Sequence, residues 1–276
     1  MVTAYTGVSF RHVDRVMLTI GFVGTGTLTE AVVTGLMQSH AGRCHILLSP
    51  RSEVVSQRLA AAHEDVRRCA SNREVVEGSD VVVLAVLPKQ LAEVAAELAF
   101  RPEQLVVNCV AGASVEAVKR LVAPAREVVR VVPLPPIRFR QGPIAVYPAH
   151  PVVEELFGGL GDLIVAGQES ELTAIAHASG MMSSFYAMQN TVIGWLESRG
   201  IAGPTAALYM RSLYAGLGAL GLDAARKGEP IDPAHHETAG GLNECARRHL
   251  SAHGWFDEIS AALDAVERHV PSKPRD

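Results

Sequence analysis

Cysteine is scarce in this sequence, and the few cysteines that occur are far apart. There are four in 276 residues, and no two of them form a C-x-x-C pair. A chain of this length with such spacing is not built around a disulfide framework. We expect all four to be buried, small apolar residues of a cytoplasmic protein, in a reducing compartment. They are Cys44, Cys69, Cys109 and Cys245.

The sequence also lacks a strong excess of charge and an uninterrupted apolar span. Its formal net charge is −4 and its basic residues are scattered, which excludes the basic stripe of a nucleic-acid-binding protein. Residues 172–196 contain no Asp, Glu, Lys or Arg and are long enough to raise the question of a membrane span. They also carry polar side chains, among them His177, Gln189 and Asn190. We therefore expect no membrane partner, and instead a helix buried on most sides, within a domain or between subunits.

A set of metal ligands is missing as well. His249 and His253 lie four residues apart, a spacing that suits two ligands on one face of a helix. No third ligand accompanies them, and the neighbouring Arg247 and Arg248 oppose a cation. We expect these histidines to lie on a solvated face and predict no metal.

The first half of the sequence does contain a regular alternation of short apolar runs and helical patterns. The helical patterns include residues 29–39 and 53–63, the second after a candidate N-cap at Ser52. Such alternation is typical of a parallel sheet with helices on both faces. We therefore predict an α/β fold whose N-terminal Rossmann domain spans residues 17–168. The expected strands are 18–23, 45–48, 80–86, 105–110, 127–132, 143–147 and 162–165.

The apolar, β-rich runs stop after about Gly167. Helical periodicity continues almost to the end of the chain, with breaks at glycine and proline. We therefore predict an all-helical domain over residues 169–270, with polar tails at residues 1–16 and 271–276. The first tail has no apolar run and is not expected to be a signal peptide. The expected helices are 170–181, 184–199, 204–227, 234–252 and 255–269.

A glycine turn follows the first expected strand and opens a helix. Gly24 permits a tight turn, and Gly26 lets the backbone approach a pyrophosphate, which the helix N-terminus then stabilises. Thr29 occupies the third glycine position of G-x-G-x-x-G, so the match is incomplete. The incomplete motif is weak evidence by itself, but its position between a strand and a helix is the one that dinucleotide binding requires. We therefore predict a dinucleotide site here.

The end of the second expected strand indicates which dinucleotide is bound. An NAD-binding fold usually carries Asp or Glu here to hold the ribose 2′-hydroxyl. This sequence has Ser49, Arg51 and Ser52 instead, and Glu53 comes only within the following helix. An arginine beside two hydroxyls suits a 2′-phosphate. We therefore predict NADP as the cofactor.

These features together resemble the pyrroline-5-carboxylate reductase family over residues 17 to about 270. The family's first strand and glycine turn are matched by Gly21–Ala31, and its Arg-Ser pair by Arg51-Ser52. Its Leu-Ala-Val-Lys-Pro-Gln run is matched, with one inserted residue, by Leu84–Gln90. Its Ala-Gly and Ser-Gly pairs are matched by Ala111-Gly112 and Ser179-Gly180.

Two segments depart from the family pattern where the substrate is expected to bind. The family's Met-Pro-Asn-Thr-Pro segment corresponds to residues 132–136, in which Leu134 replaces the asparagine. Its carboxylate-holding Ser-Pro-Gly-Gly-Thr-Thr loop corresponds to Thr238–Asn243, which keeps both glycines and loses both threonines. Because these changes alter the available hydrogen-bond donors, we expect pyrroline-5-carboxylate to be a poor substrate and another imine to be preferred.

The resemblance implies an NADP-dependent reductase that transfers hydride from NADPH to the C=N bond of a cyclic imino acid. It also implies a role in proline biosynthesis and a homodimer, or a higher oligomer, joined through the helical domain. No catalytic residue is assigned, because a protonated iminium needs little acid catalysis. The expected substrate-binding residues are Thr238, Gly240, Gly241, Leu242 and Asn243. The expected cofactor-binding residues are Gly24, Thr25, Gly26, Thr27, Leu28, Ser49, Arg51, Ser52, Asn72, Ala85, Val86, Leu87, Pro88, Ala111 and Gly112.

Two other functions remain open from the sequence. One is a reductase of a different imine or carbonyl compound on the same two-domain plan. A β-hydroxyacid-dehydrogenase-like enzyme usually has a catalytic lysine on a long interdomain helix, and residues 169–225 contain no lysine. The other is a dinucleotide-binding sensor that has lost catalysis, consistent with the altered substrate loop. Turnover of any imine with NADPH excludes the sensor.

Overall fold

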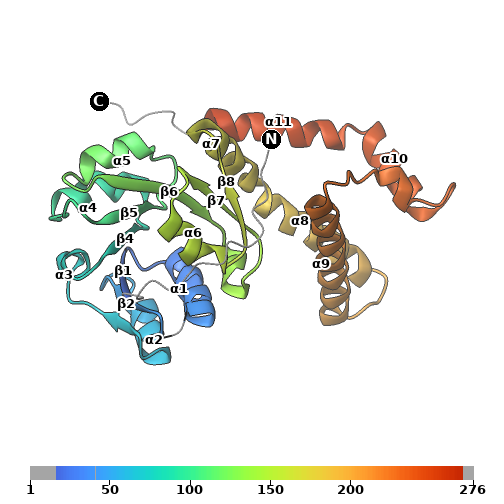
Figure 1. The fold of residues 1–276 in the computed structure, drawn as a ribbon. Coiled ribbons are helices and arrows are strands. Elements are labelled where there is room, and N and C mark those ends of the chain that lie inside the picture. The colour runs from blue at the N-terminus through green and yellow to red at the C-terminus, as the bar shows by residue number, and fades with distance from the viewer. Residues whose placement is uncertain (1–16, 41, 270–276) are drawn as a thin grey trace. The chain divides into compact units, whose positions relative to one another are not determined.

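The computed structural model describes residues 17–40 and 42–269, which form two compact units (Figure 1). The first unit ends at Thr173 and the second begins at Ala174. The predicted boundary between residues 168 and 169 falls at the start of helix α7, Glu169–Ala178, within which the units divide. The two predicted tails lie outside the described residues, as does residue 270.

The first unit is built on one eight-stranded sheet in the order β3-β2-β1-β4-β5-β6-β7-β8. All neighbouring strands are parallel except β6 and β7, which are antiparallel. The order reverses between β1 and β4, as in a Rossmann fold, so the predicted α/β class is confirmed. The strands are β1 Leu18–Val23, β2 Cys44–Leu48, β3 Val66–Arg68, β4 Val81–Leu84, β5 Leu105–Asn108, β6 Glu127–Pro133, β7 Pro143–Tyr147 and β8 Asp162–Val165.

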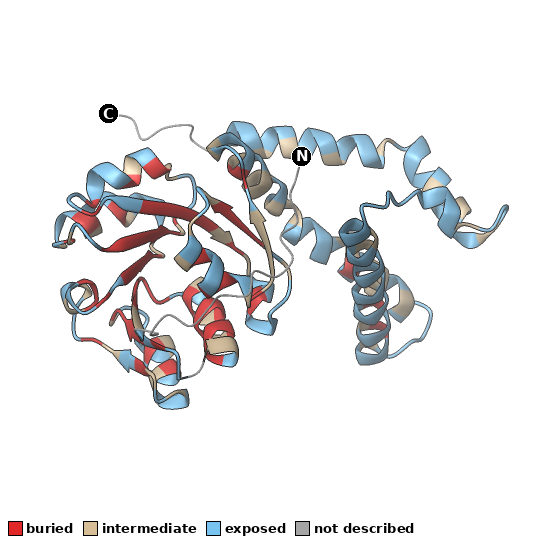
Figure 2. Ribbon diagram, viewed as in Figure 1, coloured by how far each residue is buried: buried red, intermediate tan, exposed pale blue. Residues whose placement is uncertain are grey.

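Helices cover both faces of this sheet (Figure 2). The inner strands β4 and β5 are buried at every residue, whereas the edge strands β3 and β8 are largely half-buried or exposed. One hydrophobic core joins alternate strand residues to α1 and α6, and a second joins the other residues to α3, α4 and α5. Two 3₁₀ turns, η1 and η2, precede α4 and β7. These elements are α1 Thr27–His40, α2 Glu53–Ala62, α3 Asn72–Glu77, η1 Pro88–Gln90, α4 Leu91–Ala96, α5 Val115–Leu121, η2 Pro135–Phe139 and α6 Pro151–Gly158.

Side-chain caps begin two of these helices. Ser71 accepts a hydrogen bond from the backbone N–H of Glu74 at the start of α3, and Ser114 accepts one from that of Ala117 at the start of α5. The predicted cap at Ser52 is wrong, because its side chain makes no cap hydrogen bond. The Ser52 backbone is left-handed, with φ 59°, whereas a capping residue normally has extended backbone angles.

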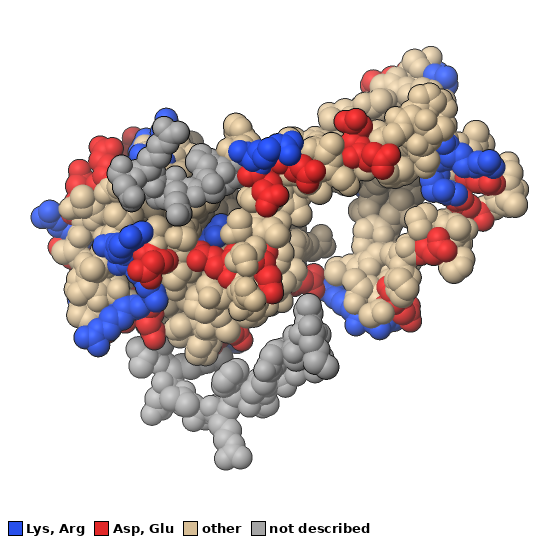
Figure 3. Space-filling model, turned by 90° about the horizontal axis from the view of Figure 1, so that it is seen from above, with Lys and Arg blue, Asp and Glu red and all other residues tan. Residues whose placement is uncertain are grey.

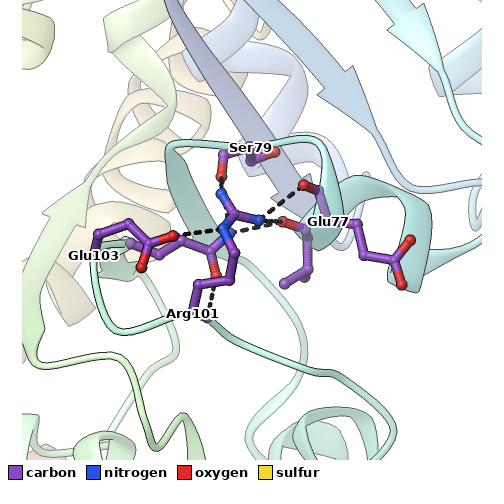
Figure 4. Close-up of polar contacts among 6 residues, drawn as sticks. Glu77, Ser79, Arg101 and Glu103 are labelled. Carbon is purple, nitrogen blue, oxygen red and sulfur yellow. Dashed lines mark hydrogen bonds and ion pairs between the residues drawn. The ribbon is translucent and has the colours of Figure 1, made fainter.

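The amino-terminal edge of the sheet is held by Arg101, which lies just before β5 (Figure 4). Its guanidinium donates to the carbonyl oxygens of Glu77 and Ser79, both at 2.8 Å, and to the Glu103 carboxylate at 2.8 Å. These contacts fasten the loop before β4 to the loop before β5.

The second unit contains only helices among its described residues. Helices α8 and α9 pack against each other, and α10 packs against α11. The predicted helix over residues 234–252 is wrong: a 3₁₀ turn, η4, is followed by a loop, because Gly240 has a φ of +70° that ends helical geometry. The elements are η3 Ser179–Met181, α8 Met182–Glu197, α9 Gly203–Lys227, η4 Pro233–His236, α10 Leu242–Ala252 and α11 Trp255–His269.

Helix α8 is more exposed in the single chain than the sequence predicts. Its large apolar side chains Phe185, Tyr186 and Trp195 are 42%, 59% and 54% exposed, and only Gln189 is buried. Burial within its own domain is therefore excluded for this helix, and burial between subunits remains as the alternative. No helix of the described part of the chain is long and apolar enough to cross a membrane.

Candidate functional site

The glycine turn after β1 lies against the end of β4. Gly24 has a φ of +99°, and a Cβ atom there would lie 2.4 Å from the carbonyl oxygen of Ala85. The Ala85 N–H in turn donates to the Val23 carbonyl at 2.9 Å. Only glycine permits both this backbone angle and this approach. The turn therefore sits where the strand order reverses, the usual dinucleotide position in such a sheet.

Buried hydroxyl groups fasten the turn to the end of β2. The Gly24 N–H donates to Ser49 Oγ at 3.0 Å, and Thr25 Oγ1 donates to the Ser49 carbonyl at 3.0 Å. Both side chains are buried. Their observed role is thus to shape the turn, and direct contact of either with a cofactor stays a prediction.

Thr29 and Gly26 explain how the incomplete glycine motif is accommodated. The Thr29 hydroxyl donates to the Gly24 carbonyl at 2.6 Å, so its polar group is satisfied although the side chain is buried. A Cβ atom at Gly26 would meet nothing within 4 Å. Open space therefore lies beside Thr27, at the N-terminus of the 14-residue helix α1, where free N–H groups favour a phosphate.

Arg51 is exposed beyond the end of β2 and contacts a residue that the sequence did not single out. With its amide oriented so that the oxygen faces Arg51, Gln90 accepts from the guanidinium at 2.7 and 2.8 Å. Gln90 follows β4, so this contact spans the loops after β2 and β4. Glu53 is the first acidic residue after β2, and its Oε1 lies 3.5 Å from Nη2 of Arg68 in β3. Its carboxylate is therefore already paired with an arginine of the chain.

The remaining predicted cofactor residues also lie at the carboxyl-terminal edge of the sheet. Leu87 is 57% exposed in the loop after β4. Gly112, with a φ of +73°, and Ala111 are exposed after β5, and Asn72 begins α3 after β3. Because adjacent parallel strands end at the same edge, these residues are brought together there. Pro88 and Val86 flank Leu87, the first exposed and the second half-buried.

Asn108, a second residue missed from the sequence, shapes the loop after β5. Its buried side chain donates from Nδ2 to the Ala113 carbonyl at 2.9 Å and accepts from the Val110 N–H at 2.9 Å. An asparagine at a strand end commonly organises the following turn in this way, and that position is the signal by which it could have been found.

The predicted substrate loop of the second unit is internally hydrogen-bonded. The Gly240 N–H donates to Glu244 Oε2 at 2.6 Å, and the Gly241 N–H donates to the Thr238 carbonyl at 2.7 Å. Asn243 donates from Nδ2 to the His236 carbonyl at 3.0 Å. Leu242 is 89% exposed at the first position of α10.

An ion pair anchors this loop to α10. Arg247 Nη2 donates to Glu237 Oε2 at 2.8 Å, and Arg247 Nε donates to Glu237 Oε1. The hydrogen bonds from Arg247 lower the pKa of the Glu237 carboxyl below its usual range, and the charge of Arg247 adds to the effect. The bidentate geometry fixes the loop in one orientation relative to the helix.

Other groups capable of catalysis are not assembled in the described residues. No cluster of three or more His, Cys, Asp or Glu side chains suited to a metal occurs there. Burial, with the Asp65 carboxylate adding, raises the pKa of the Cys44 thiol to about 11, so it is not a nucleophile. The predicted burial holds for Cys44 and Cys69 and is wrong for Cys245, which is exposed on α10. Acidic and basic side chains are interspersed on the face seen in Figure 3.

Comparison with protein families supports a nucleotide-dependent oxidoreductase. The family model described as NADP oxidoreductase coenzyme F420-dependent matches residues 19–112, which hold the glycine turn and the loops after β2, β4 and β5. The pyrroline-5-carboxylate reductase of Pseudomonas aeruginosa is 28% identical over 262 residues, 90% of this chain and 94% of the relative. That of Vibrio alginolyticus is 25% identical over 264 residues, again 90% and 94%.

Solved structures show the same fold. The pyrroline-5-carboxylate reductase of Streptococcus pyogenes superposes with a TM-score of 0.77 at 18% identity, over 93% of this chain and 99% of that chain. The enzyme from Coxiella burnetii gives 0.74 at 21% identity, over 94% and 100%. The Plasmodium falciparum pyrroline carboxylate reductase, solved with NADP bound, gives 0.74 at 15% identity, over 92% and 97%.

The sequence matches cover 90% of this chain and 94% of each relative, and so leave only a small part of either chain unaligned. Identity below 30% over that length indicates divergence rather than a close equivalent. The chain is similar to pyrroline-5-carboxylate reductases over nearly its whole length and shares the fold of the solved ones.

Proposed function

We propose that this protein is an NADP-dependent reductase that transfers a hydride to the carbon of a C=N bond in a cyclic imino acid or a related imine. The observation that carries the proposal is the alignment with 94% of the length of a pyrroline-5-carboxylate reductase. The glycine turn between β1 and β4 supports it independently, because that position suits a dinucleotide.

The residues at the carboxyl-terminal edge of the sheet fit NADP. The open space beside Gly26 and the start of α1 would receive the pyrophosphate. Arg51, held by Gln90, would pair with the 2′-phosphate, while Glu53 is drawn toward Arg68. NADPH supplies the hydride when it is bound, and the chain's residues bind and orient it.

Loops on the two sides of the point where the strand order reverses would bind different halves of the cofactor. The loop after β2 lies on the side of β1 that would take the adenosine half. The loops after β4 and β5, residues 85–88 and 111–112, lie on the other side and would border the nicotinamide. Because a protonated iminium accepts hydride readily, the proposal assigns no side chain as a proton donor. Orientation and exclusion of water are then the protein's main contributions.

The proposed assembly is a homodimer, or a multiple of it, formed through the second unit. Helix α9 exposes a stripe of leucines at helical spacing, with Leu208, Leu213, Leu217 and Leu220 at 71%, 42%, 50% and 62% exposure. They line an open hollow of about 740 Å³. Apolar area of this extent is unfavourable in water. A second copy supplies the matching surface, because a two-fold axis places one stripe against the other.

The proposed location is the cytoplasm, with a role in proline biosynthesis or a related imine pathway. All four cysteines carry free thiols, which suits a reducing compartment.

Turnover of a panel of cyclic imines with NADPH tests the proposed activity. The purified protein should oxidise NADPH only when an imine is present and should yield the corresponding cyclic amine. NADPH binding without turnover of any member of the panel would reject the reductase and favour the dinucleotide-binding sensor.

A further inference from the structure

The loop before α10 holds a carboxylate of the chain's own. Glu244, in the first turn of α10, reaches back so that its Oε2 accepts from the Gly240 N–H at 2.6 Å. The second glycine N–H of the loop, that of Gly241, is bound to Thr238. The two glycine donors available to a substrate carboxylate at this turn are therefore both occupied within the chain.

We infer that Glu244 is a specificity-determining residue that directs the enzyme toward cyclic imines without a carboxylate and against imino acids. This inference rests on the proposed function, because it concerns the substrate of the same reaction and places that substrate at the loop of Gly240 and Gly241. It names the substrate class more narrowly than the fold or the family does.

Glu244 also shapes the charge of the surface that a substrate would meet. Gly240, Gly241, Glu244, Cys245 and Arg248 line an open hollow of about 320 Å³. Within it, the other Glu244 oxygen, Oε1, lies 3.2 Å from Nη1 of Arg248, whose side chain is 74% exposed. The Glu244 side chain is only 24% exposed and is held at both oxygens. Glu244 is thus the less exposed and more firmly held of the two charges that line the hollow, and Arg248 is the more exposed one.

Neither neighbouring arginine is available to pair with a substrate carboxylate. Arg247 is already engaged by both carboxylate oxygens of Glu237. Arg248 shares its charge with Glu244, so a second carboxylate would have to divide one exposed guanidinium with the first. An incoming imino acid would therefore lose the Gly240 donor and meet a like charge at close range. A cationic iminium without a carboxylate would instead meet an opposite charge.

The expected change in substrate preference follows from the strength of the hydrogen bond between the Glu244 carboxylate and the Gly240 N–H. A hydrogen bond between a backbone N–H and a charged carboxylate contributes enough to change binding by about tenfold or more. Releasing Gly240 from Glu244 should therefore increase efficiency on a carboxylate substrate by about that factor. It should leave the efficiency on a cyclic iminium without a carboxylate unchanged or slightly lower.

The test compares 1-pyrroline-5-carboxylate with 1-pyrroline, which differ only in the carboxylate. Glu244→Gln removes the charge and Glu244→Ala also frees the Gly240 N–H. Glu267→Gln, an exposed residue of α11, is the matched control. Wild-type protein should have the higher kcat/KM on 1-pyrroline. Glu244→Ala should shift the ratio of the two kcat/KM values toward the carboxylate substrate by about tenfold. Glu244→Gln should shift it in the same direction by less, because its amide oxygen can still accept from the Gly240 N–H, and the control should not shift it.

A binding measurement separates this inference from the proposed activity. With NADP present, calorimetry of L-proline and pyrrolidine compares ligands with and without the carboxylate, and circular dichroism checks that each variant is folded. Glu244→Ala should bind proline about tenfold more tightly than the wild type, with pyrrolidine unchanged. If the wild type reduces neither imine, the proposed function fails, and the proline measurement still decides the role of Glu244. Equal effects on both ligands, or no gain for proline in either variant, would overturn the inference.

Discussion

Arg51 is the residue on which the proposed preference for NADPH depends most directly. Its exposed guanidinium is held by Gln90 beyond the end of β2, where a 2′-phosphate would lie. Arg51→Ala should weaken NADPH binding by roughly ten- to a hundredfold, because a hydrogen bond to a charged group contributes about 1.5–3 kcal/mol. NADH, which lacks the phosphate, should be little affected.

Calorimetric titration of both dinucleotides checks this prediction. Arg120→Ala removes an exposed arginine of α5 on the helix that follows β5, and it should leave both affinities unchanged. An equal loss of NADPH and NADH affinity in Arg51→Ala would show that the guanidinium does not recognise the 2′-phosphate.

A residue that is required for a particular backbone conformation could be identified from the sequence. A residue whose role depends on a contact with a distant side chain or backbone group could not. Gly24 was found because a glycine between a strand and a helix implies a tight turn, and the structure gives it a φ of +99°. Gln90 and Glu244 carry no such mark. Their roles arise from contacts with Arg51 and Gly240, and a contact of this kind is a property of the folded chain.

At the scale of elements, Glu169 of α7 links three parts of the first unit. Its Oε1 accepts from the Val115 N–H at the start of α5 at 2.8 Å and lies 3.3 Å from Nη1 of Arg130, whose side chain is 6% exposed. Nη1 of Arg130 also donates to Thr173 Oγ1 at 3.0 Å. Removing the carboxylate leaves a buried cation with a hydroxyl as its remaining side-chain partner.

Glu169→Ala should therefore lower the free energy of unfolding by about 1.5–3 kcal/mol, the usual contribution of a hydrogen bond to a charged group. Chemical denaturation followed by circular dichroism measures this change. Glu93→Ala, which alters an exposed residue of α4, should stay within about 0.5 kcal/mol of the wild type. An equally small change in Glu169→Ala would mean that the pair with Arg130 adds nothing to stability.

Element prediction succeeded where apolar residues marked the whole element, and it failed where they were too few or where a glycine interrupted the pattern. The strands β1, β7 and β8 were predicted with the bounds observed. Strand β3, Val66–Arg68, was missed because it has three residues, of which one is buried and two are arginines. The helix predicted from residue 234 failed because Gly240 breaks a segment whose composition otherwise suits a helix.

At the scale of the whole molecule, the exposed leucines of α9 predict association. Light scattering of the wild type at micromolar concentration should give a dimer or a multiple of it. Leu217→Glu places a charge in the centre of the stripe, where Leu217 is 50% exposed, and should shift the protein toward the monomer. Burying an unpaired carboxylate costs several kcal/mol, which is enough to dissociate a dimer of ordinary affinity.

The matched control for assembly is Leu121→Glu, since Leu121 is an exposed leucine of the first unit, 36% exposed. This variant should keep the wild-type mass. A stable wild-type monomer, or the same mass for wild type and Leu217→Glu, would rule out the α9 stripe as the interface.

The class of the molecule could be inferred from the sequence more fully than its substrate. Alternation of strands and helices is repeated over the whole first half, so many separate segments of the sequence each indicate the same α/β fold. The predicted substrate loop is indicated by a single short motif, the glycine pair. Its hydrogen bonds involve Glu237, Glu244 and Arg247, which lie outside that pair. Family resemblance therefore predicts the chemistry, whereas the proposed substrate preference depends on these particular side chains.

Hydride transfer itself is tested most directly by isotopic labelling. NADPH carrying deuterium at the transferable position of the nicotinamide is incubated with the protein and a cyclic imine, and the amine product is analysed by mass spectrometry and NMR. We expect the product to carry deuterium at the former imine carbon. Amine formed without the label at that carbon, or no amine from any imine tested, would contradict the assignment of this protein as an NADPH-dependent imine reductase.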